Sequence, residues 1–178
     1  FVTLKDVIDL VGPDVTRFVM LTRKNDAPLD FDFDKVLDQS KDNPVFYVQY
    51  AHARICSVMR KVSEAGVDMS DAALQGADLA HLSHEAELAL AKKLGEWPRM
   101  LELAAKHHEP HRIAFYLFDL ASEYHSLHNL GKTAPELRFW QADNTDVSRA
   151  KIALIRATAV VLSPGLGILG VTPMQEMR

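Results

Sequence analysis

The strongest constraint on the fold is a series of helix start and stop signals along the chain. Asn43-Pro44 is the clearest start, because asparagine can cap free N–H groups and proline suits the first helical position. This helix is predicted to run to about Glu64 and to end at Gly66. Comparable signals predict helices over residues 4–11, 14–22, 83–94, 97–107, 110–131 and 146–162. Antiparallel helices joined by short loops predict an all-α helical bundle.

The punctuation between these helices predicts caps and connections. Ser83 is expected to cap the helix that follows it, and Ser163-Pro164-Gly165 is expected to stop the last helix. Residues 29–34 alternate apolar and acidic, but one short run without a partner strand predicts an extended connector. Residues 132–145 lack periodicity and are expected to form a loop.

Length and composition limit the class of protein. The 178 residues suffice for one generous helical domain with a short appendage. No stretch reaches the roughly 18 uninterrupted apolar residues that span a bilayer, so no membrane partner is expected. The single cysteine, Cys56, cannot form an internal disulfide and indicates a reducing cytoplasm. Because the first residue is Phe1 rather than methionine, we expect the chain to be part of a longer protein.

Basic residues are unevenly distributed along an acidic chain. The net charge of -4 has the wrong sign for bulk attraction to nucleic acid. Residues 43–63 nevertheless contain no acid, and residues 147–175 contain none either. The cations of these two basic islands are Arg54, Arg60 and Lys61 in the first and Arg149, Lys151 and Arg156 in the second.

Two neighbouring stripes run along the helix that begins at Pro44, because successive residues are rotated by about 100°. The stripe expected to face the core comprises Val48, Ala51, Ile55, Met59 and Val62. The second, here called the aromatic stripe, comprises Tyr47, Tyr50, Arg54, Val58 and Lys61.

The aromatic stripe has two interpretations. Tyrosine rings can stack on unpaired bases while cations meet phosphates, and each stacked base is worth about 1–3 kcal/mol. Alternatively, the tyrosines flank the core and extend their hydroxyls to water. Periodicity alone favours the second interpretation.

No catalytic or metal site is predicted. His125 and His128 form an i,i+3 pair, but zinc requires a third and fourth ligand that the sequence does not supply. Cys56 has no base paired with it and is expected to be a buried thiol. The glycines of residues 165–170 follow a helix instead of a strand, which is not the pattern of a phosphate-binding loop.

Residues 42–60, DNPVFYVQYAHARICSVMR, resemble the best-known segment of the C-terminal domain of arginyl-tRNA synthetases, which are class I enzymes. The similarity extends over residues 1–21, 27–44, 109–129 and 149–171 and so covers most of the chain. Residues 67–81 and 132–145 are the least similar and are predicted to be variable surface connections. The D-A-L-R tetrapeptide that names the domain is absent, and its counterpart is expected near residues 146–150.

The resemblance implies an all-helical anticodon-binding domain at residues 35–178, preceded by a connector at residues 1–34 that packs against the catalytic domain of the same chain. The implied partner is the anticodon arm of arginine tRNA, with no DNA binding and a monomeric parent enzyme. The implied RNA contacts are Tyr47, Tyr50, Arg54, Lys61, Tyr124, His125, His128 and Met177. Because Arg178 follows Met177, the terminal carboxylate is displaced from its position in the family, while the thioether can still pack against a base.

The HIGH and KMSK motifs of class I synthetases do not occur in the sequence. The resemblance therefore implies that the full-length enzyme attaches arginine with ATP and Mg²⁺, and that this fragment is inactive alone. Two alternatives are a helical scaffold whose exposed aromatics bind a partner protein, and the equivalent domain of another class I synthetase.

Overall fold

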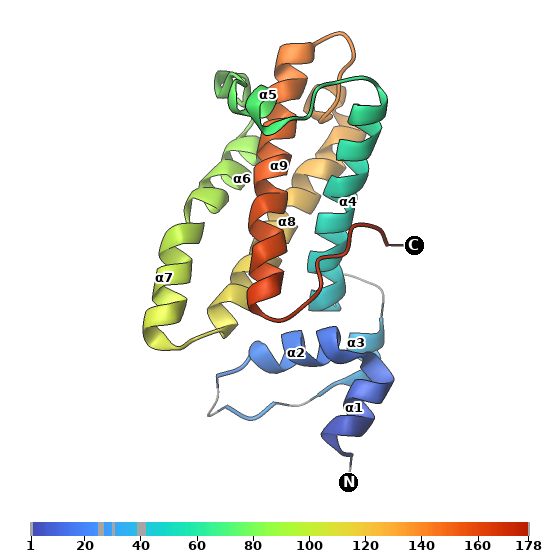
Figure 1. Ribbon diagram of the computed structural model, residues 1–178, viewed down its shortest axis with the longest axis vertical. Coiled ribbons are helices and arrows are strands. Elements are labelled where there is room, and N and C mark those ends of the chain that lie inside the picture. Colours follow the sequence, from blue (N-terminus) through green and yellow to red (C-terminus); the bar gives the residue numbers. More distant parts are fainter. Residues whose placement is uncertain (1, 25–26, 30, 39–41, 178) are drawn as a thin grey trace.

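The computed structural model describes residues 2–24, 27–29, 31–38 and 42–177, which contain helices and no strand. The α-helices are α1 Leu4–Val11, α2 Pro13–Leu21, α3 Phe33–Leu37, α4 Pro44–Glu64, α5 Asp71–Gln75, α6 Glu85–Gly95, α7 Trp97–His107, α8 His111–Thr133 and α9 Thr145–Ile168. Two 3-10 turns, η1 Leu79–His81 and η2 Pro135–Leu137, lie between them. The long helices stand side by side, and α1–α3 lie across one end of them (Figure 1). The predicted all-α bundle is confirmed.

Helix α8 forms the centre of the bundle, since it packs against α4, α6, α7 and α9. Its inward side chains, which include Leu117, Leu120 and Tyr124, are completely buried. They meet Ile155 and Leu162 of α9 in one continuous apolar core. This packing fixes the relative positions of α4 and α8, the two helices that carry the candidate site.

Helix α4 has the predicted bounds. The side-chain oxygen of Asn43 accepts a hydrogen bond from the N–H of Phe46 at 3.2 Å, and Pro44 occupies the first turn. The amide group of Asn43 also donates to the carbonyl of Val36 at 2.7 Å. The same residue therefore starts α4 and ties it to α3.

The N-terminal helices are joined to the bundle. Phe18 of α2 is 1% exposed and belongs to the main core. Residues 29–34 are not extended throughout, because α3 begins at Phe33, where the side chain of Asp32 caps the N–H of Lys35. The predicted boundary between residues 34 and 35 falls inside α3, and the division of the chain into two parts stays a prediction.

The prediction that the last helix stops at Ser163 is wrong. Helix α9 continues through Pro164 to Ile168, although proline lacks an N–H and crowds the preceding turn. The next residue, Gly165, lies close against α8, because a Cβ atom there would lie 2.6 Å from Cδ2 of Leu117. The close approach of α9 to α8, together with burial of Leu166, holds the final turn.

Helix α9 is also apolar enough and long enough to cross a membrane, with a mean hydropathy of 1.5 in its most apolar window. Half of that window is buried inside the bundle. The core helix of a globular protein has the same composition, and the absence of a membrane partner stays an expectation.

Two further predictions need correction. His84 rather than Ser83 caps α6, since Nδ1 of His84 accepts a hydrogen bond from the N–H of Ala86 at 3.2 Å. The carboxylate of Glu87 in turn accepts hydrogen bonds from the N–H groups of Ser83 and His84. The segments predicted as connections contain short helices, α5 and η1 in residues 67–81 and η2 in residues 132–145. These elements have five residues or fewer, too short for periodicity to reveal.

Candidate RNA interface

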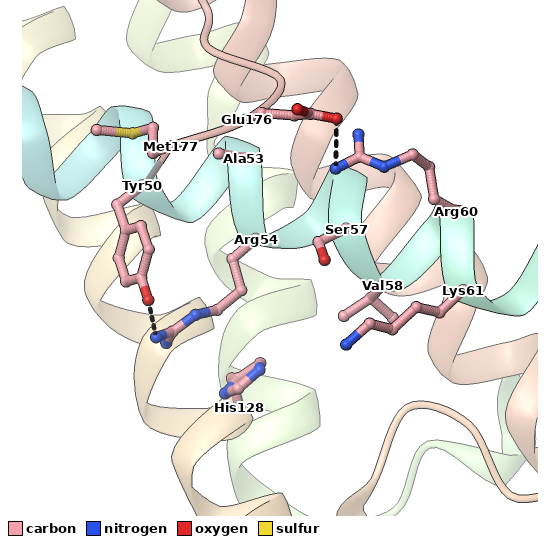
Figure 2. Close-up of a pocket in the computed structure, with 10 residues that line it drawn as sticks. All are labelled: Tyr50, Ala53, Arg54, Ser57, Val58, Arg60, Lys61, His128, Glu176 and Met177. Atoms are coloured by element: carbon pink, nitrogen blue, oxygen red, sulfur yellow. Dashed lines mark hydrogen bonds and ion pairs between the residues drawn. The ribbon is translucent and has the colours of Figure 1, made fainter.

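A cavity of about 500 Å³, here called the α4 pocket, opens between α4, α8 and the C-terminal tail, residues 171–177. Its lining comprises Tyr50, Ala53, Arg54, Ser57, Val58, Arg60, Lys61, His128, Glu176 and Met177 (Figure 2). Five residues predicted to contact RNA therefore meet in one place from three separate segments. They are Tyr50, Arg54, Lys61, His128 and Met177.

Arg54 is fixed against Tyr50, one turn earlier on α4. Its Nη2 donates to the Tyr50 hydroxyl at 2.7 Å, and the guanidinium carbon lies 4.3 Å from the centroid of the tyrosine ring. The ring itself is stacked on Phe46, with centroids 5.7 Å apart and planes inclined by 16°. Hydrogen bonding and cation–π attraction thus hold a charged plane and an aromatic plane together at the pocket.

His125 of α8 holds Arg54 in position through a hydrogen bond. Its Nε2 lies 3.2 Å from the carbonyl oxygen of Tyr47, which can only accept, so Nε2 carries the proton. Nδ1 is then free to accept from Nη1 of Arg54 at 3.3 Å. Burial lowers the pKa of His125 to about 4, and the positive charge of Arg54 acts in the same direction. The ring is therefore neutral at neutral pH, as its two contacts require.

The structure predicts a pH dependence of stability from His125. The unfolded imidazole titrates near pH 6.5, so between about pH 6.5 and 4 the unfolded chain binds a proton that the folded chain does not. Stability must therefore fall as the pH falls through this window, by about 1 kcal/mol per pH unit for this group. Urea unfolding at pH 7 and pH 5 should show a smaller loss for His125→Gln, which cannot titrate. Equal losses in the two proteins would contradict the assignment.

Tyr124 and His125 are buried, which does not favour direct contact with RNA, and that role stays a prediction. Tyr124 is completely buried, its ring is stacked on Phe139 with planes inclined by 7°, and burial raises the pKa of its hydroxyl. His125 is 4% exposed. Both lie on the side of α8 that packs against its neighbours.

Tyr47 occupies an intermediate position. Its half-buried ring packs against Phe118, at a centroid distance of 5.1 Å, and against His125 at 4.6 Å. It does not line the α4 pocket. Tyr47 therefore supports the core edge, and its contact with a base stays a prediction, whereas Tyr50 lies directly at the cavity.

Polar side chains of α4 hold the C-terminal tail in place. Gln49 donates to the carbonyl of Thr172 at 2.9 Å, and Nδ1 of His52 donates to the carbonyl of Met174 at 2.7 Å. Arg60 then reaches the tail near its end, with Nη2 3.3 Å from the carboxylate of Glu176. These contacts bring Met177 to the α4 pocket, and its contact with RNA stays a prediction. Arg178 lies outside the described residues.

Sequence reasoning missed Gln49 and His52, which are 5% and 6% exposed. A signal was present, because two polar residues at i and i+3 share a face of α4 close to the core stripe. Buried polar groups require partners, and the partners here come from a segment more than 100 residues away.

Cys56 is half-buried rather than buried, and its sulfur lies 3.8 Å from Nδ1 of His52. The contact holds the pKa of the Cys56 thiol below its usual value. That nitrogen already donates to the carbonyl of Met174, so it cannot take a proton from the thiol. The pair therefore supports the tail and lacks the arrangement of a nucleophile with its base.

The two basic islands have different roles. In the second island, Lys151 forms a buried ion pair with Glu87 at 3.3 Å, and Arg156 lies 3.6 Å from Asp71. The first island supplies Arg54, Arg60 and Lys61 to the α4 pocket, against the single carboxylate of Glu176. A locally positive surface thus exists on an acidic protein. Among the described residues, no three histidine, cysteine, aspartate or glutamate side chains are grouped to hold a metal ion.

The chain is similar to a known domain family and to known proteins. The DALR anticodon binding domain family matches residues 48–177. The arginine–tRNA ligase of Ruegeria pomeroyi is 67% identical over all 178 residues, and that of Roseobacter denitrificans is 65% identical over the same length. The arginyl-tRNA synthetase structure from Thermus thermophilus aligns with a TM-score of 0.76 and 26% identity, covering 94% of this chain and 27% of that one.

The chain spans 31% of the length of the Ruegeria ligase and 30% of the Roseobacter ligase. The matched family segment begins inside α4 and runs to the C-terminal tail, so it includes every residue that lines the α4 pocket. The chain therefore belongs to the DALR anticodon-binding domain family.

Proposed function

We propose that the α4 pocket binds an unpaired base of the anticodon loop of arginine tRNA. The observation that carries this proposal is Arg54 held against the ring of Tyr50 beside an open cavity rimmed by Arg60 and Lys61. Aromatic faces bind bases of any sequence, and cations beside them meet the phosphates of the same strand.

Each side chain of the α4 pocket is expected to make a different contact with the RNA. Tyr50 offers a ring for stacking, and Lys61, which is exposed, offers charge to a phosphate. Arg54 uses Nη2 on Tyr50 and Nη1 on His125, so its remaining N–H donors are available to a base edge or to a phosphate. Met177 supplies a polarizable thioether that can pack against a base.

The role in the whole enzyme follows from the relatives, which are arginine–tRNA ligases. The full-length protein would attach arginine to tRNA in the cytoplasm, with ATP and Mg²⁺ acting in a catalytic domain of the same chain. The sequence here contains neither HIGH nor KMSK, so this part contributes recognition and is expected to be inactive alone. The parent enzyme is expected to be a monomer.

Binding of arginine tRNA to the 178-residue chain tests the proposal. The logarithm of the affinity should fall with the logarithm of the salt concentration, by about 0.7 for each phosphate neutralised on a single strand. A tRNA of different anticodon should bind more weakly. A preference for the tRNA of another amino acid would instead favour a different class I synthetase.

Two results would contradict the proposal. One is the absence of a mobility shift with any tRNA. The other is a salt-insensitive association with a protein through the same aromatic surface, which would favour the scaffold alternative.

A further inference from the structure

A second cavity, of about 260 Å³, lies next to the α4 pocket and is here called the Trp140 pocket. Its lining comprises Val58, Lys61, Val62, His128, Gly131, Lys132, Leu137, Arg138, Phe139 and Trp140. Val58, Lys61 and His128 line both cavities, so the two are contiguous across the groove between α4 and α8. Neighbouring parts of one ligand can therefore occupy both cavities.

The wall of the Trp140 pocket is built by a close approach at Gly131. A Cβ atom at this position would lie 3.2 Å from the carbonyl oxygen of Leu137 and 3.4 Å from Cα of Arg138. Nε of Arg138 donates to the carbonyl of Gly131 at 3.3 Å, and Phe139 is buried against Tyr124. Residues 137–140 are therefore held on α8, and Trp140 has a defined position beside the cavity.

Charge and shape favour a nucleotide as the occupant. Lys61, Lys132 and Arg138 are exposed cations in the lining, which contains no carboxylate. Trp140 is half-buried, with one part packed against the small cluster around Val62. The cavity is slightly smaller than the roughly 300–1,000 Å³ of sites for drug-sized ligands, which suits a single aromatic base.

His128 separates the two cavities. Its Nδ1 is buried without a hydrogen-bond partner in the part of the chain that the structure describes. Burial lowers the pKa of His128 to about 4, and the nearby Arg54 and Lys132 act in the same direction. At neutral pH the ring is uncharged, so it can lie between two bases without repelling the cations around it.

We propose that the Trp140 pocket binds a second unpaired nucleotide of the same RNA, next in the strand to the one in the α4 pocket. The base lies against the indole ring, and its phosphate meets Lys132 and Arg138. Stacking on tryptophan combined with a cationic rim is the usual way of holding single-stranded nucleic acid. The inference rests on the proposed function, because it assigns the second nucleotide of that RNA.

Tryptophan fluorescence tests the inference, because the chain has only Trp97 and Trp140. The Trp97→Phe variant leaves Trp140 as the sole reporter. Titration with the isolated anticodon arm of arginine tRNA should give a saturable loss of emission at the concentrations where anisotropy of labelled RNA shows binding. Acrylamide should also quench Trp140 less in the complex, since a base covers the ring.

The Trp140→Phe variant is the matched control, because Trp97 begins α7 and packs against Tyr116 at a centroid distance of 5.3 Å. Helix α7 lies on the opposite side of the bundle from α4 (Figure 1). The emission of this variant should not change. Binding of the RNA without any change in Trp140 would overturn the inference while leaving the proposed function intact. Failure of the RNA to bind either variant or the unmodified chain would overturn both.

Lys132→Gln provides an independent test without altering the indole. Loss of one phosphate contact should reduce the salt slope by about 0.7 and weaken binding at low salt. Lys106→Gln, in the last turn of α7, removes an exposed lysine that lines neither pocket and should leave the slope unchanged. Identical slopes for the two variants would contradict a phosphate at Lys132.

Discussion

Substitution of Tyr50 by alanine will weaken binding of the anticodon arm of arginine tRNA by about 1–3 kcal/mol, or roughly 5- to 150-fold. The change removes the ring on which a base is expected to stack. It also removes the hydroxyl that accepts from Arg54 at 2.7 Å, so the guanidinium loses one of its two anchors. Both effects act on the same pocket.

Tyr50→Phe separates the two contributions, because it keeps the ring and loses only the hydroxyl. Its binding should lie between that of the alanine variant and that of the unmodified chain, measured by anisotropy with urea unfolding as a check on stability. Unchanged binding by the Tyr47→Ala/Tyr50→Ala double variant would falsify the stacking assignment.

Substitution of Lys151 by alanine will lower the free energy of unfolding by about 3–5 kcal/mol. The side chains of Lys151 and Glu87 are 4% and 3% exposed, and Nζ lies 3.3 Å from Oε1 as an ion pair that is not aligned as a hydrogen bond. Lys151 also donates to the carbonyl of Glu136. Removing the cation leaves the carboxylate of Glu87 buried with only its bonds to backbone N–H groups.

A paired substitution gives the control. In Lys151→Met/Glu87→Gln no charge remains buried, so much of the lost stability should return. Arg156→Ala removes the partner of Asp71 in an exposed ion pair, since the Arg156 side chain is 42% exposed. Such exposed pairs contribute at most about 1 kcal/mol to stability. A loss at Lys151 no larger than at Arg156 would contradict the importance of the buried pair.

Local signals predicted the helices well where caps and periodicity agreed. Asn43-Pro44 placed the start of α4 correctly, and the α7 helix has the predicted bounds, because these features depend on neighbouring residues alone. The prediction that α9 stops at Pro164 failed because the end of this helix depends on distant residues. The contact between Gly165 and Leu117 joins residues far apart in sequence, and no local rule anticipates that it outweighs a proline.

The site was predictable in part. Periodicity placed Tyr50 and Arg54 on one stripe of α4. The family resemblance then favoured RNA binding by that stripe over the alternative that its tyrosines only flank the core. The sequence could not show that Tyr124 is buried whereas His128 lines the α4 pocket, because only the packing of α8 distinguishes the two residues. The anchoring of the tail by Gln49 and His52 likewise depends on tertiary contacts.

We propose that the aromatic and cationic surface of α4 receives splayed nucleotides of the anticodon loop. A footprint of arginine tRNA with the 178-residue chain bound measures this directly, nucleotide by nucleotide. We predict protection confined to the anticodon arm and its loss in Tyr50→Ala. Protection of the acceptor stem instead, or an anticodon arm left fully accessible in the complex, would contradict it.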